Sequence, residues 1–462
     1  MSRERAPSSR SEKAAMVRRH LADIFNAALT AVDPYHSVMN AVNRDGSKLF
    51  AGNGTYDLGR FARIIVAGAG KAAARMALAV EDLLAHALTD GLIIVKKDHT
   101  VRPGKIRQVE ASHPIPDEAG VQGTRRIVEM LRLADEQTLV ICPLSGGASA
   151  LLVSPADGIT LEDKQRATDL LLRSGAAIQE VNAVRKHLSS VKGGRLAQIA
   201  YPAPVLTLIM SDVIGDPLDV IASGPTVPDS TAFTDALAVV GRYGLRGKLP
   251  ERVLSFLERG AAGREPETPK ENDPCFLKTG NVIVAGLRQA LAAARETAAG
   301  LGMTAEIMTS ELQGEARGAA RLLAEKAMSM GRSLHAGERQ CLLAGGETTV
   351  TVKGSGVGGR NQELALAFAL EIAGKEGITL LSAGTDGADG PTDAAGAIVD
   401  GRTVPRARAL GMDPATYLEN NDSYAFFTTY DSRSGEEAHF ITGPTGTNVM
   451  DVQIIAVEGS GP

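Results

Sequence analysis

Short apolar runs alternate with amphipathic, alanine-rich stretches along most of the 462-residue chain. The runs are rich in Val, Ile and Leu and have the length of buried strands, whereas the stretches between them carry the spacing of helices. This alternation predicts an α/β fold with mostly parallel, buried strands. The predicted strands that bear on function lie in "RIIVAGAG", "GLIIVKKD", "EQTLVICPLSGG", "PVLTLIMSD", "RQCLLAGGE" and "ITLLSAGTDG".

One polar stretch, "ERGAAGREPETPKENDP" at residues 258–274, interrupts this alternation and is rich in Gly, Pro and charge. A chain of this length also exceeds one core of ordinary size. We therefore predict an N-terminal α/β domain over residues 13–257, a linker over 258–274 and a C-terminal α/β domain over 275–462. A cleft between the two domains is the expected place for a site.

Composition excludes several classes of protein. Hydrophobic residues make up 44% of the chain, but no apolar run approaches the ~20 residues that span a bilayer. The N-terminal "MSRERAPSSRSEK" has no apolar segment of a secretory signal and is predicted to be a frayed tail. Three widely spaced cysteines fit a reducing cytoplasm. A net charge of −5 and an aromatic content of 4% without Trp argue against a nucleic-acid partner.

The predicted strands end in Gly, Ser or Asp turns, and ligands of open α/β sheets bind beyond the carboxyl ends of strands. In "GAGKAAARM", Lys71 stands at the start of a helix and could attract a phosphate or carboxylate, or could be solvated. The Gly-x-Gly turn could also bind NAD(P), but the following strand lacks an acid at the usual place for the ribose.

The turn "PLSGGASALL" brings Ser145, Gly146, Gly147 and Ser149 to a predicted helix start, which suits an oxyanion. A capped, tightly packed helix explains the same residues. No G-x-x-x-x-G-K-[ST] phosphate loop occurs, and no G-x-S-x-G elbow supports a serine hydrolase.

Two clusters of aspartates follow predicted strands, in "SDVIGDPLD" and "GTDGADGPTD". Their first members, Asp212 and Asp386, could hold Mg²⁺ or accept a proton, whereas ordinary turns need neither role. The eight histidines share no metal-binding spacing, so solvated or structural roles are expected for each.

The stretch "VKGSGVGGRNQELAL" at residues 352–366 crowds four glycines ahead of Arg360. Glycines of this kind let backbone N–H groups close on an anion, and a helix start and a guanidinium add positive potential. A turn followed by a capped helix explains the stretch equally well.

Nine motifs in order resemble the glycerate 2-kinases whose C-terminal half is the MOFRL domain: "GAGKAAARM", "SHPIPD", "PLSGGASALL", "RKHLSSVKGGRLA", "SDVIGDPLDVIASGPT", "GGETTV", "GVGGRNQELAL", "GTDGADGPTDAAGA" and "GPTGTNVMD". The resemblance implies a Rossmann-like α/β N-terminal domain and a MOFRL-type α/β C-terminal domain, with the active site in the interdomain cleft. It implies phosphorylation of D-glycerate at the 2-hydroxyl by ATP with Mg²⁺.

The same resemblance implies catalytic roles for Lys71 and Arg360 and places Asp212 and Asp386 in the active site. We expect both aspartates to be catalytic, one of them as the base, which is left open, and Asp386 to be the metal ligand. Residues expected to contact substrate or phosphate are Ser145, Gly146, Gly147, Ser149, Glu347, Gly358, Gly359, Asn361 and Asn448. Relatives are often labelled hydroxypyruvate reductases, so NAD(P)H-dependent reduction is the alternative. A cytoplasmic enzyme of small molecules is expected, without nucleic acid or membrane partners, and a homodimer is left open.

Overall fold

The computed structural model describes residues 10–102 and 104–459, which fold into two compact units. The inserted unit comprises residues 34–285. The outer unit comprises residues 10–33 together with residues 286–459. The chain therefore begins in the outer unit, builds the whole inserted unit, and then returns.

The inserted unit is built on a six-stranded, fully parallel sheet with the order β6-β5-β4-β7-β8-β9. Numbered along the chain from β4, this is the order 3-2-1-4-5-6 of Rossmann folds. The central strands β7 and β8 are buried throughout, as expected for a parallel sheet with both faces covered. The strands are β4 (Arg63–Ala69), β5 (Asp90–Lys96), β6 (Ile106–Ala111), β7 (Thr138–Leu144), β8 (Val205–Met210) and β9 (Thr279–Ala285).

Helices cover this sheet, and four of them, α6, α7, α9 and α10, form a separate bundle around Phe233 and Phe256. A small antiparallel sheet, β1 (Val42–Asp45), β2 (Lys48–Ala51) and β3 (Gly54–Asp57), was not predicted. The helices are α2 (Pro34–Ala41), α3 (Ala73–Leu84), α4 (Glu118–Arg132), α5 (Ala148–Leu151), α6 (Leu161–Arg173), α7 (Ile178–His187), α8 (Arg195–Ala200), α9 (Phe233–Arg242) and α10 (Glu251–Ala261), with 3-10 turns η1 (Leu58–Arg60), η2 (Ala85–Ala87), η3 (Ile221–Ser223) and η4 (Pro274–Lys278).

The outer unit has a six-stranded mixed sheet with the order β10-β11-β15-β12-β13-β14. In the described part of this sheet, only β10 and β11 pair in parallel. Strand β15 runs antiparallel to both of its neighbours, β11 and β12, and β13 runs antiparallel to β12 and β14. The prediction of mostly parallel strands is therefore wrong for this unit, since apolar runs do not reveal strand direction. The strands are β10 (Thr304–Leu312), β11 (Arg339–Gly346), β12 (Ile378–Gly384), β13 (Gly396–Asp400), β14 (His439–Phe440) and β15 (Asp451–Glu458).

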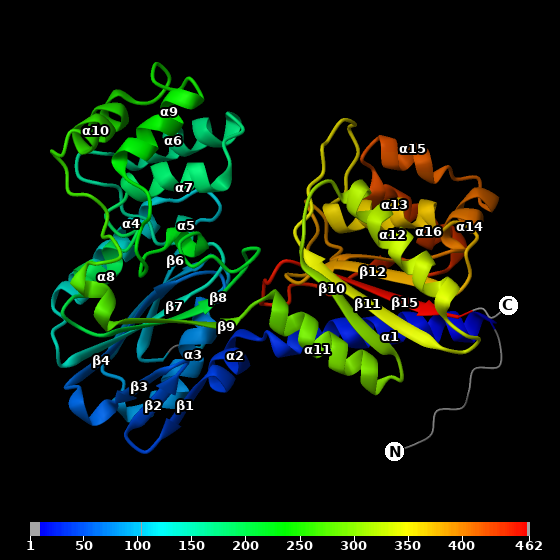
Figure 1. Ribbon diagram of the computed structural model, residues 1–462, viewed down its shortest axis with the longest axis horizontal. Helices are drawn as coiled ribbons and strands as arrows, with labels where there is room; N and C mark the ends of the chain where they lie inside the picture. Colours follow the sequence, from blue (N-terminus) through cyan, green and yellow to red (C-terminus); the bar gives the residue numbers. More distant parts are fainter. Residues whose placement is uncertain (1–9, 103, 460–462) are drawn as a thin grey trace. The chain divides into compact units, whose positions relative to one another are not determined.

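Two helical layers enclose the outer sheet. Helices α1 (Arg10–Ala31) and α11 (Leu287–Gly300) lie together on one face, and α12 (Ala316–Ser333) and α13 (Arg360–Glu371) lie on the other (Figure 1). The remaining helices are α14 (Thr403–Ala409), α15 (Pro414–Glu419) and α16 (Ser423–Ser434). Helix α13 is buried around most of its circumference, which a helix enclosed by a sheet and other helices requires.

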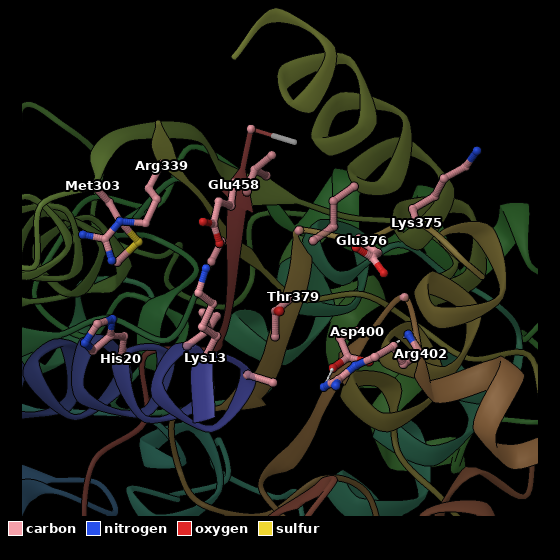
Figure 2. Close-up of a pocket in the computed structure, with 18 residues that line it drawn as sticks. Lys13, His20, Met303, Arg339, Lys375, Glu376, Thr379, Asp400, Arg402 and Glu458 are labelled. Carbon is pink, nitrogen blue, oxygen red and sulfur yellow. Dashed lines mark hydrogen bonds and ion pairs between the residues drawn. The ribbon is translucent and has the colours of Figure 1, made fainter. Parts of the chain in front are cut away.

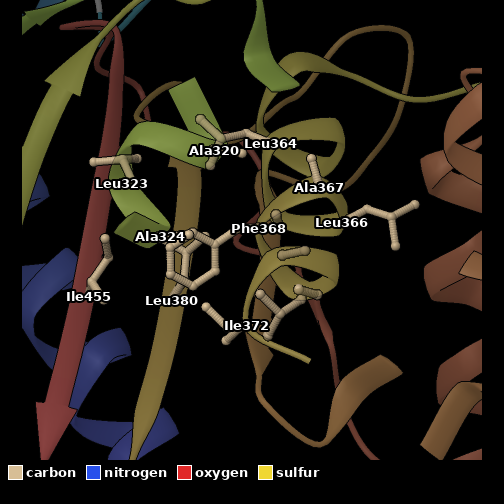
Figure 3. Close-up of a cluster of buried hydrophobic side chains, with 14 of the residues drawn as sticks. Ala320, Leu323, Ala324, Leu364, Leu366, Ala367, Phe368, Ile372, Leu380 and Ile455 are labelled. Carbon is tan, nitrogen blue, oxygen red and sulfur yellow. The ribbon is translucent and has the colours of Figure 1, made fainter. Parts of the chain in front are cut away.

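Phe368 of α13 is fully buried in the core of the outer unit, in a cluster with residues of α12 and of strands β12 and β15 (Figure 3). Alanines such as Ala320 and Ala324 let α12 and α13 approach each other closely. This packing fixes the start of α13, where Arg360 lies, against the sheet.

The two units divide the chain at places other than the predicted boundaries. Residues 258–274 lie within the inserted unit, because β9 follows them and pairs with β8 as the last strand of its sheet. Residues 10–33 belong to the outer unit, because α1 packs on α11, β12 and β15. Residues 1–9 of the predicted frayed tail lie outside the described residues. The rest of that tail is the start of helix α1, which begins at Arg10. The three cysteines are buried and form no disulfide.

No helix in residues 10–102 and 104–459 is both long and apolar enough to cross a membrane.

Candidate active site

The inserted unit has its topological switch point between β4 and β7, where the strand order reverses. The turn after β4 carries Lys71, and the turn after β7 carries Ser145, Gly146 and Gly147. The two turns are bonded to each other: the Lys71 N–H donates to the Gly146 carbonyl at 2.9 Å, and the Ala72 N–H donates to Ser145 Oγ at 3.0 Å. The parallel sheet thus brings both predicted turns together at the switch point.

Lys71 lies against Gly147, whose φ of 84° is in the left-handed region. A Cβ at Gly147 would come within 3.2 Å of Lys71 Cγ and 3.1 Å of His113 Cδ2, tighter than most real contacts. The left-handed backbone favours glycine here, and a side chain would also displace these two neighbours by a few tenths of an ångström. The side chains of Lys71 and His113 converge over this turn.

Asp212 follows β8 and faces the same turn. A Cβ at Gly146 would lie 2.1 Å from Asp212 Oδ2, so the carboxylate lies directly against the Gly146 backbone. Burial raises the pKa of Asp212 above its usual value, and the positive charge of Lys71 opposes this rise. Lys71 and Asp212 are therefore close enough to interact electrostatically, as a phosphoryl-transfer site with a base and a cation needs.

His113, for which a solvated or structural role was predicted, lies beside the same turn. Burial, together with the positive charges of Lys71, Lys96 and His99, lowers the pKa of His113 to about 4. The ring is consequently neutral at physiological pH. The sequence motif "SHPIPD" gave no chemical signal for this residue, because its place beside Gly147 depends on the parallel sheet.

Ser145 and Ser149 have different surroundings. Ser145 is 2% exposed and accepts from the Ala72 N–H, so it holds the two turns together. Ser149 Oγ lies 3.2 Å from Ser223 Oγ, and Ser223 was not predicted as a site residue. Helix α5, which carries Ser149, has four residues, so it supplies no long helix terminus.

The outer unit has its own cluster of predicted residues, centred on Arg360 at the start of α13. The Arg360 guanidinium binds the Asp451 carboxylate through both oxygens, with Nε–Oδ2 at 2.5 Å and Nη2–Oδ1 at 2.9 Å. Its Nη1 lies 3.2 Å from Glu347 Oε1. The charge of Asp386 also acts on Asp451, and a Cβ at Gly384 would meet both carboxylates. Glu347, Arg360, Asp386 and Asp451 therefore gather at one edge of the sheet.

The glycines before Arg360 have a packing role. A Cβ at Gly358 would lie 2.1 Å from Ser423 Oγ, and one at Gly359 would lie 2.2 Å from Asp389 Cγ. Asp389 is 2% exposed and accepts from the backbone N–H groups of Asn361 and Gln362, at 3.0 and 2.8 Å. The first turn of α13 is thus already capped by a carboxylate, which favours the capped-helix interpretation of this stretch.

Two predicted contact residues of the outer unit are engaged within the protein. Asn361 is 1% exposed, and its Oδ1 accepts from Ser382 Oγ at 2.7 Å. Asn448 Oδ1 accepts from the Met450 N–H at 3.1 Å, as a turn residue does. Within the described residues, no group of three or more His, Cys, Asp or Glu side chains is arranged to hold a metal ion.

A cavity of about 340 Å³ lies at the opposite edge of the outer sheet from Arg360. It is lined by basic and acidic side chains, including Lys13, Arg339, Lys375 and Glu458 (Figure 2). None of the predicted site residues lines it.

Comparison with known proteins identifies two families along the chain. Residues 20–258 match the domain of unknown function DUF4147, and residues 340–451 match the MOFRL family. A D-glycerate 2-kinase of Thermotoga maritima is 44% identical over 85% of this chain and 90% of its own length. A glycerate 2-kinase of Pyrococcus horikoshii is 40% identical over 94% of this chain and 96% of its own.

A protein of Agrobacterium vitis described as a putative hydroxypyruvate reductase is 43% identical over 86% of this chain and 99% of its own. The crystal structure of glycerate kinase from Thermotoga maritima superposes with a TM-score of 0.83 at 40% identity, covering 96% of this chain and all of the other. Identity at this level over nearly whole chains, with one fold, leaves a single assignment: the chain belongs to the glycerate 2-kinase family, which joins a DUF4147 domain to a MOFRL domain.

Proposed function

We propose that this protein transfers the γ-phosphoryl group of ATP to the 2-hydroxyl of D-glycerate, giving 2-phosphoglycerate and ADP. The observation that carries the proposal is 44% identity to a D-glycerate 2-kinase over 85% of the chain. The geometry supports it, because Lys71 and Asp212 meet at the switch point of a Rossmann-order sheet. Phosphoryl transfer needs positioning and charge more than covalent chemistry from the protein.

In the inserted unit, we assign the hydroxy acid to the turn around Gly147. Asp212 would accept the proton of the substrate hydroxyl, which its raised pKa favours because a stronger base takes a proton more readily. Lys71 would stabilise negative charge on the transferred group. His113, neutral at physiological pH, would offer a ring nitrogen to a substrate oxygen.

In the outer unit, we assign Arg360 to the phosphates of ATP. Its ion pairs with Asp451 and Glu347 hold the guanidinium plane in one orientation. Since the N–H groups of Asn361 and Gln362 are bonded to Asp389, we place the phosphates on the guanidinium rather than on the terminus of α13. The proposal requires that Lys71 and Arg360 reach the same ATP during turnover.

Magnesium fits the donor set around Asp386. This carboxylate is half-buried, and its Oδ1 accepts from the Ala388 N–H at 3.2 Å. Mg²⁺ is commonly bound by one or two carboxylates together with substrate phosphates and waters, so a cage of three side chains is not needed. Asp386 would hold the ion, which would neutralise charge on the phosphates.

The reductase alternative is weakened by the backbone of the first Gly-x-Gly turn. A dinucleotide pyrophosphate binds free N–H groups at such a turn. Here the N–H groups of Gly70, Lys71 and Ala72 donate to Ile94 O, Gly146 O and Ser145 Oγ. The turn is therefore closed by the protein itself.

We also propose a cytoplasmic location, where ATP is available and buried cysteines stay reduced. Three predictions from the sequence remain predictions: a homodimer, the absence of a nucleic-acid partner and the absence of a membrane partner.

The test is incubation of the purified chain with D-glycerate, ATP and Mg²⁺, with ADP release measured and the product isomer identified by NMR. We expect 2-phosphoglycerate in stoichiometric amount with ADP. Consumption of NAD(P)H on addition of hydroxypyruvate, without ADP release from glycerate, would replace the kinase by the reductase.

A further inference from the structure

A line of polar side chains runs from the switch-point turn of the inserted unit to helix α7. Ser149 Oγ lies 3.2 Å from Ser223 Oγ, and Ser223 Oγ donates to Asn182 Oδ1 at 3.3 Å. Helix α5, which carries Ser149, and helix α7, which carries Asn182, both pack against turn η3, which carries Ser223. Arg185 follows Asn182 by three positions on α7 and therefore lies on the same helical face.

Two cations beside this line have no carboxylate partner. Lys192 is 0% exposed, and its Nζ donates to the Ala222 carbonyl at 3.2 Å. The Nε of Arg185 is buried and has no acceptor. Within the described part of the chain, no carboxylate forms an ion pair with either residue, whereas the neighbouring Lys186 pairs with two aspartates at 3.3 Å.

Buried cations without counter-ions are costly, because water no longer solvates them and no opposite charge replaces it. Burial lowers the pKa of Lys192 well below its usual value, and the charges of Arg185 and Lys164 lower it further. A bound anion removes this penalty. The Arg185 guanidinium keeps its positive charge, so the free protein presents a cation here that suits a negatively charged ligand.

The position of these cations indicates which part of a ligand they bind. Ser149 is two residues beyond Gly147, the residue that contacts Lys71. A small acid anchored at Ser149 would extend its remaining atoms toward Lys71 and Asp212. The anchored end is then the carboxylate, and the end at Lys71 carries the hydroxyl that reacts.

We propose that Arg185, Lys192 and the hydroxyls of Ser149 and Ser223 form the subsite that binds the carboxylate of the hydroxy-acid substrate. This inference rests on the proposed function. Arg185 binds the carboxylate through its planar guanidinium, which matches two oxygens. Lys192 is enclosed and acts as a positioning residue, through its bond to the Ala222 carbonyl.

The backbone of η3 supports the subsite. Ala222 and Ser223 have φ values of 53° and 61°, in the left-handed region that residues with a side chain rarely adopt. This conformation presents the Ala222 carbonyl to Lys192 and the Ser223 hydroxyl to Ser149. Strain of this kind persists where the surrounding structure fixes it, often at ligand sites.

The first experiment compares Arg185→Met with Arg166→Met, an exposed arginine of α6 with no ion pair among the described residues. D-glycerate binding to the full chain without ATP is measured by calorimetry. We expect Arg185→Met to weaken binding about 10- to 100-fold, the range of a charge-assisted hydrogen bond, and Arg166→Met to leave it unchanged. Arg185→Lys should recover part of the loss, because it restores the charge.

A second readout separates carboxylate recognition from a structural role. The uncharged amide of D-glycerate keeps the hydroxyls and lacks the carboxylate. Arg185→Met should lower kcat/KM for glycerate about 10- to 100-fold more than kcat/KM for the amide. Equal losses for both substrates would overturn the subsite and indicate a structural role.

The outcomes also separate the subsite from the proposed function. A wild-type chain that makes 2-phosphoglycerate while Arg185→Met binds glycerate normally would overturn the subsite alone. A wild-type chain that binds glycerate through Arg185 but releases no ADP would support the subsite and overturn the kinase. Absence of glycerate binding to the wild-type chain would overturn the subsite whatever ATP does.

Lys192→Met gives an independent check, because a buried methionine needs no counter-ion. We expect a melting temperature equal to or above that of the wild type, together with weaker glycerate binding. A lower melting temperature with unchanged glycerate binding would show that Lys192 serves the fold and not the ligand.

Discussion

Arg360 and Asp451 join the start of helix α13 to the start of strand β15 through two parallel hydrogen bonds, at 2.5 and 2.9 Å. The Asp451 side chain is 1% exposed, whereas the Arg360 side chain is 34% exposed, so the carboxylate is the buried partner of this ion pair. Burial raises the pKa of Asp451, and the bonds from Arg360 oppose this rise. The carboxylate therefore fixes the guanidinium, whose remaining nitrogen faces Glu347.

Replacement of this carboxylate should loosen the guanidinium without removing it. We expect Asp451→Asn to lower kcat by about 10- to 100-fold, because misplacement of a charge by about 1 Å costs this much. The KM for glycerate should change little, since we place glycerate in the inserted unit. Steady-state kinetics with both substrates varied measures the effect. Glu371→Gln, which breaks an exposed pair with Arg321, is the control on the same helix.

Loss of the cation at the switch point should be more severe. We expect Lys71→Ala to lower turnover by about 100-fold or more, because positive charge at the transferred phosphoryl group is lost. Lys97→Ala, at an exposed lysine after the next strand, should retain the wild-type rate. Circular dichroism should show both variants folded. A wild-type rate for Lys71→Ala would remove this residue from the mechanism.

Sequence reasoning predicted the part of the candidate site that lies at carboxyl ends of strands. Lys71, Asp212 and the turn with Gly147 were predicted because a parallel sheet brings such ends to one edge, and the structure places them together. Asp451 was not predicted because it lies at the start of its strand rather than after the end of one. It reaches the same edge as Asp386 only because β15 runs antiparallel to β12, a direction that no local pattern indicates.

The glycines before Arg360 supply a test of the packing interpretation. An added methyl group at Gly359 would meet the buried Asp389 carboxyl at 2.2 Å, so we expect Gly359→Ala to destabilise the fold by about 1–3 kcal/mol. Gly318→Ala, in open space on α12, should stabilise it by about 0.5–1 kcal/mol. Denaturant unfolding of both variants measures the difference. Equal stability of Gly359→Ala and the wild type would contradict the close packing.

Stability should depend on pH through Lys164, which is 4% exposed and donates to the carbonyls of Arg185 and Leu188. Burial lowers its pKa from 10.5 to about 7, and the charge of Arg185 contributes. Above pH 7 the unfolded chain binds more protons at this residue than the folded chain, so the free energy of unfolding rises with pH.

Between pH 7 and 9 the contribution of Lys164 is at most about 1.4 kcal/mol per pH unit. Lys164→Met should reduce the slope of stability against pH in this range. Urea unfolding at several pH values measures it. Arg173→Met, at an exposed residue of the same helix, should keep the wild-type slope.

The fold was predictable where local patterns decide it. Apolar runs and glycine turns indicated the α/β class and most strands of the inserted sheet. The domain boundary was not predictable from residues 258–274, because a polar, proline-rich stretch can end a domain or connect two elements within one. The pairing of β9 with β8 decides between a domain boundary and a connection within one domain. This pairing joins segments about 75 residues apart in the sequence.

The double passage of the chain between the units has a consequence for synthesis. Helix α1 emerges from the ribosome before all of its partners, which are α11, β12 and β15, and β15 is the latest of these. The inserted unit, residues 34–285, is complete long before that. A nascent chain stalled before residue 451 should therefore carry one finished unit and an amphipathic helix still without its sheet, a natural substrate for a chaperone.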